Sequence, residues 1–204
     1  MSDQSTQDQR LKKGAKTRRA IVDAAAELFR RQGYAGTSIS NIISQSRQPR
    51  GSLYFHFPDG KNEIAHEALT QSADELGDML EAVFAQSATL PDAVEAICAG
   101  FAAQLKASDF QDGCPVSPFA TSVDPEQANL RTACGDTYEG WLARTELALE
   151  KYGFEKSRRS GLALVLLSAI EGALLLAKAS GTTRALDQLP TALAPLLNPA
   201  SSSS

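Results

Sequence analysis

The chain has 204 residues, of which 43% are hydrophobic and 22% are charged, and these values exclude an intrinsically disordered chain and a disulfide-stapled miniprotein. Its net charge of −4 is unevenly placed: residues 1–61 carry 11 Lys and Arg against 5 Asp and Glu, whereas residues 62–204 carry 9 against 19. A basic head on an acidic body is typical of a protein whose N-terminal part binds nucleic acid, although a solvated basic tail on an ordinary enzyme has the same pattern.

Residues 1–16 have few apolar side chains and several lysines, so the sequence predicts a flexible basic arm there. From residue 17 onward, Ile21, Ala25 and Phe29 recur at helical spacing, which predicts an amphipathic helix. Gly33 is a suitable end for this helix, because glycine readily adopts the left-handed conformation that often terminates helices.

Two short helices are predicted next. Thr37 and Ser38 offer N-capping hydroxyls to the first, and Pro49 can begin the second, over residues 49–55, because its missing N–H would have no partner in a first turn. Two short helices joined by a polar turn predict a helix-turn-helix over residues 37–57. We therefore expect a three-helix DNA-binding domain at residues 17–60.

The rest of the chain also has helical periodicity, and strand-like alternation is nowhere convincing. We expect a long helix from Gly60 to about Ala85 that links two domains, and a loop over residues 108–124. Further helices are predicted over residues 89–105, 125–152, 154–179 and 186–197. The predicted fold is therefore all-α, with a second helical domain over residues 61–198 and a disordered tail at 199–204.

Cysteine usage and hydropathy bear on the location of the protein. The three cysteines are an odd number without C-x-x-C spacing, and the polar N-terminus has no secretory signal, which predicts a reduced, cytoplasmic setting. The apolar segment 162–177 is short for a membrane span and contains Glu171 near its centre, so we expect no membrane helix.

Motifs of catalysis are missing from the acidic part of the chain. It contains no G-x-S-x-G, no H-E-x-x-H and no P-loop. His56 has no Cys, Asp or second His at metal-ligand spacing. We therefore expect a protein that is not an enzyme and that has no metal site and no cofactor, with a helical enzyme carrying a basic arm as the alternative.

The segment from Thr17 to Phe57 closely resembles the DNA-binding domain of the TetR family of bacterial repressors. The residues that carry this resemblance are Ala25, Leu28, Phe29, Gly33, Tyr34, Thr37, Ile42, the run Gly51-Ser52-Leu53-Tyr54, His56 and Phe57. The run FPDGK at residues 57–61 and the Gly113-Cys114-Pro115 loop resemble the LmrA/YxaF-like branch. Arg47 departs from the pattern, because the family usually has a glycine in this turn; a left-handed backbone there would cost about 1 kcal/mol.

The resemblance implies a DNA-reading surface. Thr37 and Ser38 would hold a phosphate at a helix start, and residues around Arg50 would reach base edges in the major groove, where an arginine can bind a guanine through two hydrogen bonds. Gly51 would let the backbone approach the DNA, and Tyr54, His56 and Lys61 would contact phosphates. The predicted DNA contacts are Thr37, Ser38, Gln48, Arg50, Gly51, Ser52, Tyr54, His56 and Lys61.

The resemblance also implies a small-molecule pocket and a dimer interface in the second domain. Large apolar residues at helical spacing are more often plain core, but the family binds ligands beside its fourth helix. The predicted pocket residues are Phe84, Phe101, Leu105, Phe110, Cys114, Phe119, Tyr138 and Trp141. A helix that is apolar nearly all round needs cover on more than one side, which a partner subunit can provide. The predicted interface residues are Leu162, Leu166, Ala169, Gly172, Ala173 and Leu176.

These features together predict a ligand-responsive transcriptional repressor. It would bind palindromic double-stranded operator DNA as a homodimer and be released by a small hydrophobic or aromatic effector. A ligand-independent DNA-binding protein and an activator on the same fold are the alternatives. Glu171 could pair across the dimer interface or lie in the pocket, and Cys114 could sense redox state, although no adjacent basic group activates its thiol.

Overall fold

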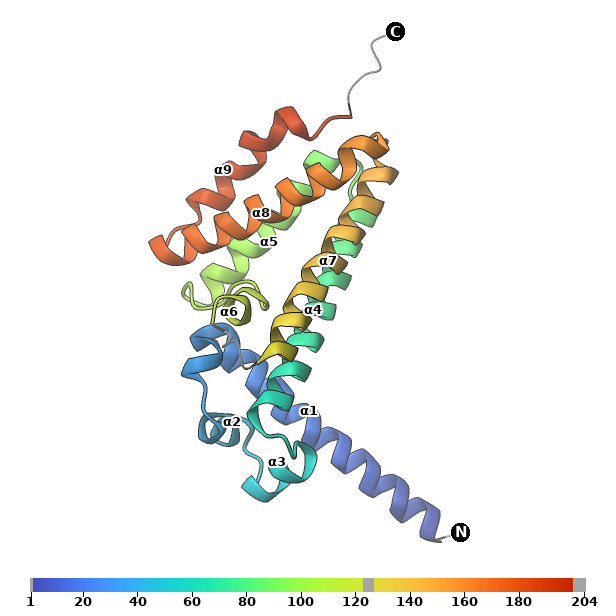
Figure 1. Cartoon of the computed structure of the whole chain (residues 1–204), viewed down its shortest axis with the longest axis vertical. Coiled ribbons are helices and arrows are strands. Elements are labelled where there is room, and N and C mark those ends of the chain that lie inside the picture. The colour runs from blue at the N-terminus through green and yellow to red at the C-terminus, as the bar shows by residue number, and fades with distance from the viewer. Residues whose placement is uncertain (1, 123–126, 200–204) are drawn as a thin grey trace. The chain divides into compact units, whose positions relative to one another are not determined.

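The computed structural model describes residues 2–122 and 127–199, with side chains from Lys12 onward in those ranges. The described residues form helices and no strand, which confirms the all-α prediction. Residues 200–204 of the predicted disordered tail lie outside the described residues. The helices, shown in Figure 1, are α1 (Ser2–Gly36), α2 (Ile39–Ser46), α3 (Arg50–His56), α4 (Lys61–Gln86), α5 (Leu90–Ala107), α6 (Ser117–Ala120), α7 (Ala128–Lys151), α8 (Lys156–Ser180), α9 (Arg184–Leu193) and the 3-10 helix η1 (Ala194–Leu196).

The chain divides into two compact units. Unit 1 consists of residues 1–72 and 115–134, and unit 2 consists of residues 73–114 and 135–204. Unit 1 is larger than the DNA-binding domain predicted at residues 17–60, because it includes the first turns of α4 and helix α6. Phe119 of α6 lies edge-on to Phe29 of α1, with 5.1 Å between the ring centroids. The division therefore follows the packing of the cores, whereas the predicted boundary followed a turn in the sequence.

Helix α1 begins earlier than the sequence predicted. It runs from Ser2, so residues 2–16 of the predicted arm are helical where an irregular segment was expected, and Lys13 and Lys16 are exposed on it. Extending an existing helix requires no costly new nucleus, and residues such as Gln and Lys are good helix formers. The flexibility of the arm stays a prediction. At the other end, Gly33 has φ 71° and ψ 174°, so the helical backbone is interrupted at the predicted stop.

Capping and a strained turn define α2 and α3. The Ser38 hydroxyl accepts from the Asn41 backbone N–H at 3.1 Å, and the Asn41 side chain accepts from the Ser38 N–H at 2.9 Å. This capping box pairs N–H groups that a helix start would otherwise leave without partners. Helix α2 ends at Arg47, whose φ of 54° and ψ of 28° are left-handed, so the strain expected of a non-glycine residue is present. Pro49 is the N-cap of α3, one residue before the helix.

A charged network fixes the beginning of α4 on α1 within unit 1. The Arg18 guanidinium carbon lies 4.5 Å from the centre of the Phe57 ring. The same guanidinium pairs with Glu63 at 3.7 Å and with Glu67. These groups are partly exposed, so we expect the network to set geometry more than to add stability.

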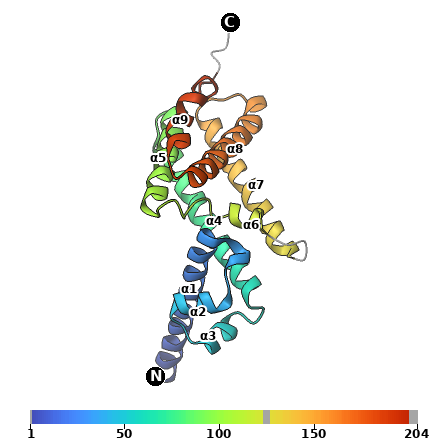
Figure 2. The ribbon, with the colours of Figure 1, turned by 90° about the vertical axis from the view of Figure 1, so that its left-hand side faces the viewer.

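Unit 2 combines two sets of helices. Helices α8 and α9 lie side by side, with α5 packed against them, as Figures 1 and 2 both show. Helices α4 and α7 are joined by side-chain hydrogen bonds: the Trp141 indole N–H donates to the Ala73 carbonyl at 3.2 Å, and the Tyr152 hydroxyl donates to the Phe84 carbonyl at 2.8 Å. These bonds hold the two long helices together around an apolar interior.

Helix α8 of unit 2 contains a long, strongly apolar stretch. By length and composition it is the one helix in residues 2–122 and 127–199 that could cross a membrane, with a mean hydropathy of 2.0 in its most apolar window. The core helix of a soluble protein can meet the same criterion. Leu166, Leu174 and Ala177 are buried within unit 2, while Leu164 and Leu175 are exposed. Part of the apolar surface of α8 is therefore used by the core, and part remains uncovered.

Candidate functional site

Helix α3 displays large side chains to solvent and anchors itself through Leu53. Leu53 is fully buried, whereas Tyr54 is 45% exposed and Phe55 is 80% exposed. Arg50 is exposed at the first position of the helix, with its guanidinium carbon 5.9 Å from the centre of the Tyr54 ring. A Cβ added to Gly51 would have no neighbour within 4 Å, so no contact within the described chain requires a glycine there. The exposed set includes Phe55, which the sequence analysis did not select.

Thr37 and Ser38, just before α2, were predicted to hold a phosphate together, but they differ in their exposure to solvent. Thr37 is 1% exposed, and its hydroxyl donates to the Gly33 carbonyl at 2.9 Å. Because this hydroxyl is buried and its proton is used inside the fold, Thr37 closes the end of α1 and contributes no side chain to the exposed surface. Ser38 is exposed at the N-cap and keeps its place among the candidates.

Three predicted contacts lie at the edges of α3. Gln48, Ser52 and His56 are half-buried. The Gln48 amide donates to the Ser46 carbonyl at 3.2 Å, and the His56 ring lies edge-on to the Phe55 ring, with 5.1 Å between centroids. These side chains flank the exposed face formed by Arg50 and its neighbours.

Lys61, at the first position of α4, is held by an aromatic ring. Its ammonium nitrogen lies 4.0 Å from the centre of the Tyr34 ring. Burial lowers the pKa of Lys61 and raises the pKa of Tyr34. The face of an aromatic ring attracts a cation, so Tyr34 positions the Lys61 charge at the start of α4. The sequence analysis noted Tyr34 only as part of the family resemblance, because its partner is distant along the chain.

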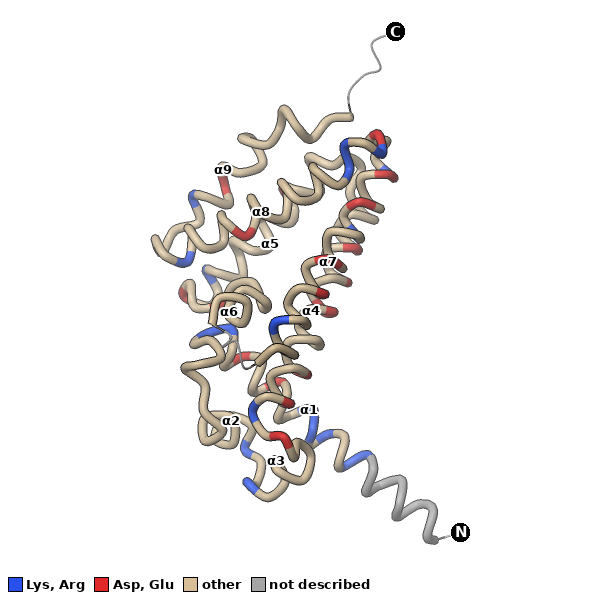
Figure 3. The backbone as a smooth tube through the Cα atoms, in the orientation of Figure 1, with Lys and Arg blue, Asp and Glu red and all other residues tan. Residues whose placement is uncertain are grey.

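The charge pattern agrees with this placement. In Figure 3, Lys and Arg positions mark α1, the turn before α3 and the beginning of α3, whereas Asp and Glu positions recur along α4 and α7. Exposed lysines and arginines around α3 favour binding of a polyanion, and the acidic helices would repel one. Among the described residues, no group of three His, Cys, Asp or Glu side chains could hold a metal ion.

A cavity of about 40 Å³ lies within unit 2, between side chains of α4, α5, α7 and α8. Three of the predicted pocket residues, Phe84, Phe101 and Trp141, line it. The aliphatic wall of this cavity was not predicted from the sequence; it includes Leu76, Leu80, Val94, Ile97, Leu167 and Ile170. The side chains that line the whole cavity come from four helices, so no local pattern in the sequence brings them together.

The other predicted pocket residues lie elsewhere. Phe119 belongs to unit 1, where it packs on Phe29 of α1. Leu105 and Cys114 are buried away from the cavity lining, Phe110 is half-buried after α5 with a left-handed backbone, and Tyr138 lies edge-on to Trp141 at 5.7 Å.

Glu171 lies in the wall of this cavity, which answers one question that the sequence left open. Its carboxylate is hydrogen-bonded to the Cys114 thiol. Burial raises the pKa of Glu171, and the bond to the thiol opposes this effect. Cys114 is itself buried and forms no disulfide, as is also true of Cys98 and Cys134. A buried thiol beside an acid is a poor environment for a reactive thiolate, which disfavours redox sensing at Cys114.

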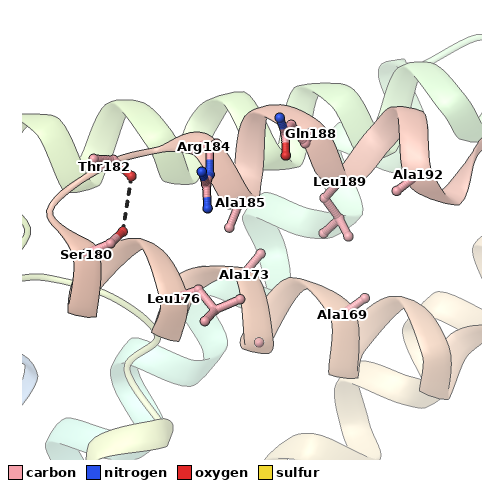
Figure 4. A pocket seen from close by; sticks show the side chains of 11 residues that line it. Ala169, Ala173, Leu176, Ser180, Thr182, Arg184, Ala185, Gln188, Leu189 and Ala192 are labelled. Carbon is pink, nitrogen blue, oxygen red and sulfur yellow. Dashed lines mark hydrogen bonds between the residues drawn. The ribbon is translucent and has the colours of Figure 1, made fainter.

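A groove of about 470 Å³ runs between α8 and α9 on unit 2. In Figure 4, Leu176 of α8 and Ala185 and Leu189 of α9 lie across the groove from one another. Two other predicted interface residues, Ala169 and Gly172, also line it.

Burial corrects the predicted dimer interface. Leu162 and Leu166 are 8% and 3% exposed within the chain itself, and Ala173 is 5% exposed, although it borders the groove. Three leucines of α8 remain exposed: Leu164 is 56%, Leu175 is 68% and Leu176 is 62% exposed, and Leu176 lines the groove. Of the predicted interface residues, Leu176 is thus the large side chain that remains available to a partner.

Comparisons with known proteins give a matching family model for each of the two parts of the chain. The family model for bacterial regulatory proteins of the tetR family matches residues 21–68, and the model for the C-terminal domain of LmrA/YxaF-like transcriptional regulators matches residues 91–191. The HTH-type transcriptional regulator LmrA of Bacillus subtilis is 29% identical over 181 residues, which are 89% of this chain and 96% of the relative. The uncharacterized regulator YxaF of the same organism is 30% identical over 160 residues, which are 78% and 84% of the two chains.

A solved structure supports the fold. A cysteine mutant of the TetR family transcriptional regulator CifR, in complex with 26-bp double-strand operator DNA, has a TM-score of 0.75 and 18% identity, and the match covers 85% of this chain and 92% of that chain. The relatives are transcriptional regulators and not enzymes, and the N-terminal match contains both α2 and α3. The chain therefore belongs to the TetR family of bacterial transcriptional regulators, in its LmrA/YxaF-like branch, with its DNA-binding domain at the N-terminus.

Proposed function

We propose that this chain is a cytoplasmic, ligand-responsive repressor that binds a palindromic operator as a homodimer and leaves it when a small hydrophobic effector binds. The observation that carries the proposal is the exposure of α3 within a DNA-binding domain. Arg50, Tyr54 and Phe55 are exposed to solvent on a helix whose Leu53 is buried. A helix displayed in this way can enter the major groove, which is wide enough to admit it.

The candidate residues divide into base readers and phosphate contacts. Arg50 is placed to bind a guanine edge, and the open space at Gly51 lets the backbone of α3 come close to the DNA. Ser38 and Lys61 stand at the beginnings of α2 and α4, where helix dipoles favour a phosphate. Tyr54 completes this set as a hydrogen-bond donor to the DNA backbone.

The exposed apolar stripe of α8 supports the homodimer. Leucines at 164, 175 and 176 face solvent beside the groove that α8 forms with α9. A second copy of the same stripe would bury them and bring two helices together at the small residues Ala169 and Gly172. Two recognition helices about 34 to 36 Å apart would then meet successive major grooves, so the operator would be palindromic.

The effector is proposed to act through α4. Leu76, Leu80 and Phe84 of this helix line the cavity, and the same helix carries Lys61 at its other end. Sites for drug-sized ligands have volumes of about 300 Å³ or more, so a ligand must widen the 40 Å³ cavity by moving its walls. An effector that binds the non-DNA geometry about a hundredfold more tightly supplies about 2.7 kcal/mol of coupling.

The test is selection of genomic fragments by the purified protein, followed by titration of the enriched sequence. We expect enrichment of one palindrome by the wild type and its loss with Arg50→Ala. Arg131→Ala is the matched control, because Arg131 is an exposed arginine on α7 and the change in net charge is the same. Equal enrichment by all three proteins would contradict the assignment of α3 as the reading helix. Addition of a chemical library to the complex then tests release, and affinity that is constant across ligands that bind the protein would contradict the coupling.

A further inference from the structure

The cavity of unit 2 has one ionisable residue in its wall. Among the residues that line it, Glu171 alone carries a carboxyl group, and Thr145 supplies the only hydroxyl. The indole N–H of Trp141 is already used, since it donates to the Ala73 carbonyl at 3.2 Å. The remaining lining is aliphatic or aromatic.

Glu171 is half-buried, and it lacks the cationic partner that a carboxylate in an apolar wall usually has. Its recorded partner is the Cys114 thiol, which is a weak hydrogen-bond donor, and no Lys or Arg in the described residues forms an ion pair with it. Removing a carboxylate from water without a cation is costly, and burial accordingly raises the pKa of Glu171. A leucine at this position would fill the wall without that cost.

Three aromatic rings lie in the same wall. Phe84, Phe101 and Trp141 come from α4, α5 and α7 and line the cavity together with Glu171 of α8. The face of an aromatic ring attracts a cation most strongly when water is excluded, and indole is the most effective ring. A single carboxylate among aromatic rings therefore offers a positively charged group both a counter-ion and favourable ring faces.

We propose that the effector of this protein is a hydrophobic organic cation, and that Glu171 is the residue that selects its charge. The inference rests on the proposed ligand-responsive function, because it specifies the class of ligand that the cavity takes. Aliphatic side chains such as Leu80 and Ile97 bind the apolar part of the ligand, while Glu171 pairs with its ammonium group. An anionic ligand of the same shape is repelled.

The test uses pairs of ligands that differ in charge alone. Phenyl, naphthyl and biphenyl compounds that carry an ethyltrimethylammonium group are compared with neutral isosteres that carry tert-butyl in place of trimethylammonium. Affinities are measured by isothermal titration calorimetry and by the shift in the thermal unfolding midpoint. In the wild type we expect the best cation to bind at least about tenfold more tightly than its isostere, a factor that corresponds to one ion pair of modest strength.

Glu171→Gln keeps the shape of the side chain and removes its charge. We expect this variant to bind the cation about tenfold more weakly and the neutral isostere as well as the wild type does. Glu139→Gln is the matched control, because Glu139 is an exposed acid on α7 outside the cavity lining. A thermal unfolding curve of each variant without ligand checks the fold, and Glu171→Leu provides a second variant without charge.

The outcomes separate the two proposals. If cations and isosteres bind the wild type equally, or if Glu171→Gln leaves the preference for cations intact, the assignment of Glu171 is overturned while the effector function stands. If neither series binds the wild type at any size, the proposed effector cavity itself is contradicted. Loss of cation binding in the control Glu139→Gln would also overturn the assignment, because it would point to the overall acidic field of unit 2.

Discussion

Aromatic side chains are exposed on helix α3 of unit 1 but buried around the cavity of unit 2. Phe55 on α3 is 80% exposed, whereas Phe84, Phe101 and Trp141 around the cavity are between 5% and 7% exposed. Exposed apolar surface in water is unfavourable, so an exposed ring on a short helix suits a helix that finishes its packing on a partner. The buried rings complete their packing within the chain and leave only about 40 Å³ between them.

This difference indicates whether each unit must rearrange before it can contact a partner or a ligand. The candidate contacts of unit 1 need no rearrangement of the fold to reach a partner, because Arg50 and Tyr54 already stand in solvent. The cavity of unit 2 must open before a ligand of ordinary size can enter. Under the proposed function, unit 1 would therefore bind its partner without rearrangement, whereas unit 2 would have to change shape when a ligand binds.

The largest effect is expected at the exposed leucines of α8. These leucines belong to unit 2, but they face solvent as the side chains of α3 do, whereas the rings around the cavity are buried. The substitutions Leu175→Glu and Leu176→Glu would place charges in the proposed dimer interface, and we expect the double variant to be monomeric. A monomer loses the second half-site, so its Kd for the operator rises roughly 100-fold or more. Sedimentation equilibrium and operator titration measure the two effects.

Leu147→Glu is the control for this variant. Leu147 is 67% exposed on α7, so the change adds a charge on another apolar surface position of the same unit. We expect the control to remain dimeric. A double variant of α8 that also remains dimeric would show that its exposed leucines face something other than a second copy.

The next effect concerns Phe55, whose ring would contact the methyl group of a thymine if α3 reads bases. Replacing one contacted thymine by deoxyuridine removes only that methyl group. We expect the wild type to lose about 0.8 kcal/mol, close to fourfold in Kd, at one position of each half-site. Phe55→Ala should bind the thymine operator more weakly and be insensitive to uracil. Equal sensitivity of the two proteins at every position would place the ring away from the bases.

The two units also differ in how far their residues could be predicted from the sequence. The helix-turn-helix was predictable because its capping residues, turn and exposed face lie within one short segment. Phe55 could have been found in the same way: Leu53 and Phe57 are four residues apart and both buried, so a residue midway between them faces outward. Thr37 was mistaken for a surface residue because a capping sequence does not show which hydroxyl is turned inward.

The cavity was much less predictable, for a physical reason. Its walls come from α4, α5, α7 and α8, and hydrophobic spacing shows which residues are buried without showing what they are buried against. Phe119 illustrates the limit, since it is fully apolar and deeply buried but packs on Phe29 in unit 1. The sequence could not distinguish a place for Glu171 in the pocket from one at the dimer interface, because the answer depends on which residues surround it in the fold.

A further effect of similar size tests the turn that precedes α3. Arg47 has a left-handed backbone, so Arg47→Gly removes the steric strain, and we expect the free energy of unfolding to rise by about 1 kcal/mol. Arg131→Gly is the matched control with the opposite sign, because Arg131 lies in the regular helix α7 and a glycine there costs about 1 kcal/mol. Urea unfolding of both variants measures the difference. A loss of stability in Arg47→Gly would mean that the arginine side chain makes a contact worth more than the strain.

The last prediction concerns the interior of unit 2, where burial disfavours the charged form of ionisable groups. Burial and the nearby Asp187 raise the pKa of Cys98 to about 11 from an ordinary value of 9.0. Because the folded state holds this proton more tightly than the unfolded chain, the stability that it contributes is complete below pH about 9 and is lost as the pH rises toward 11.

Cys98→Ala tests this prediction against the rest of the protein. The wild type should lose stability between pH 9 and pH 11 more steeply than the variant, in urea titrations at closely spaced pH values. Burial also raises the pKa of Tyr34, Cys134 and Tyr152 and lowers the pKa of Lys61 and Lys178. These groups contribute slopes of opposite sign that both proteins share, so the difference between the two slopes isolates Cys98. Identical slopes would show that Cys98 is reached by water in solution. The interior of unit 2 would then already be open enough to admit a polar ligand, and the contrast with the exposed surface of α3 would be smaller than the packing indicates.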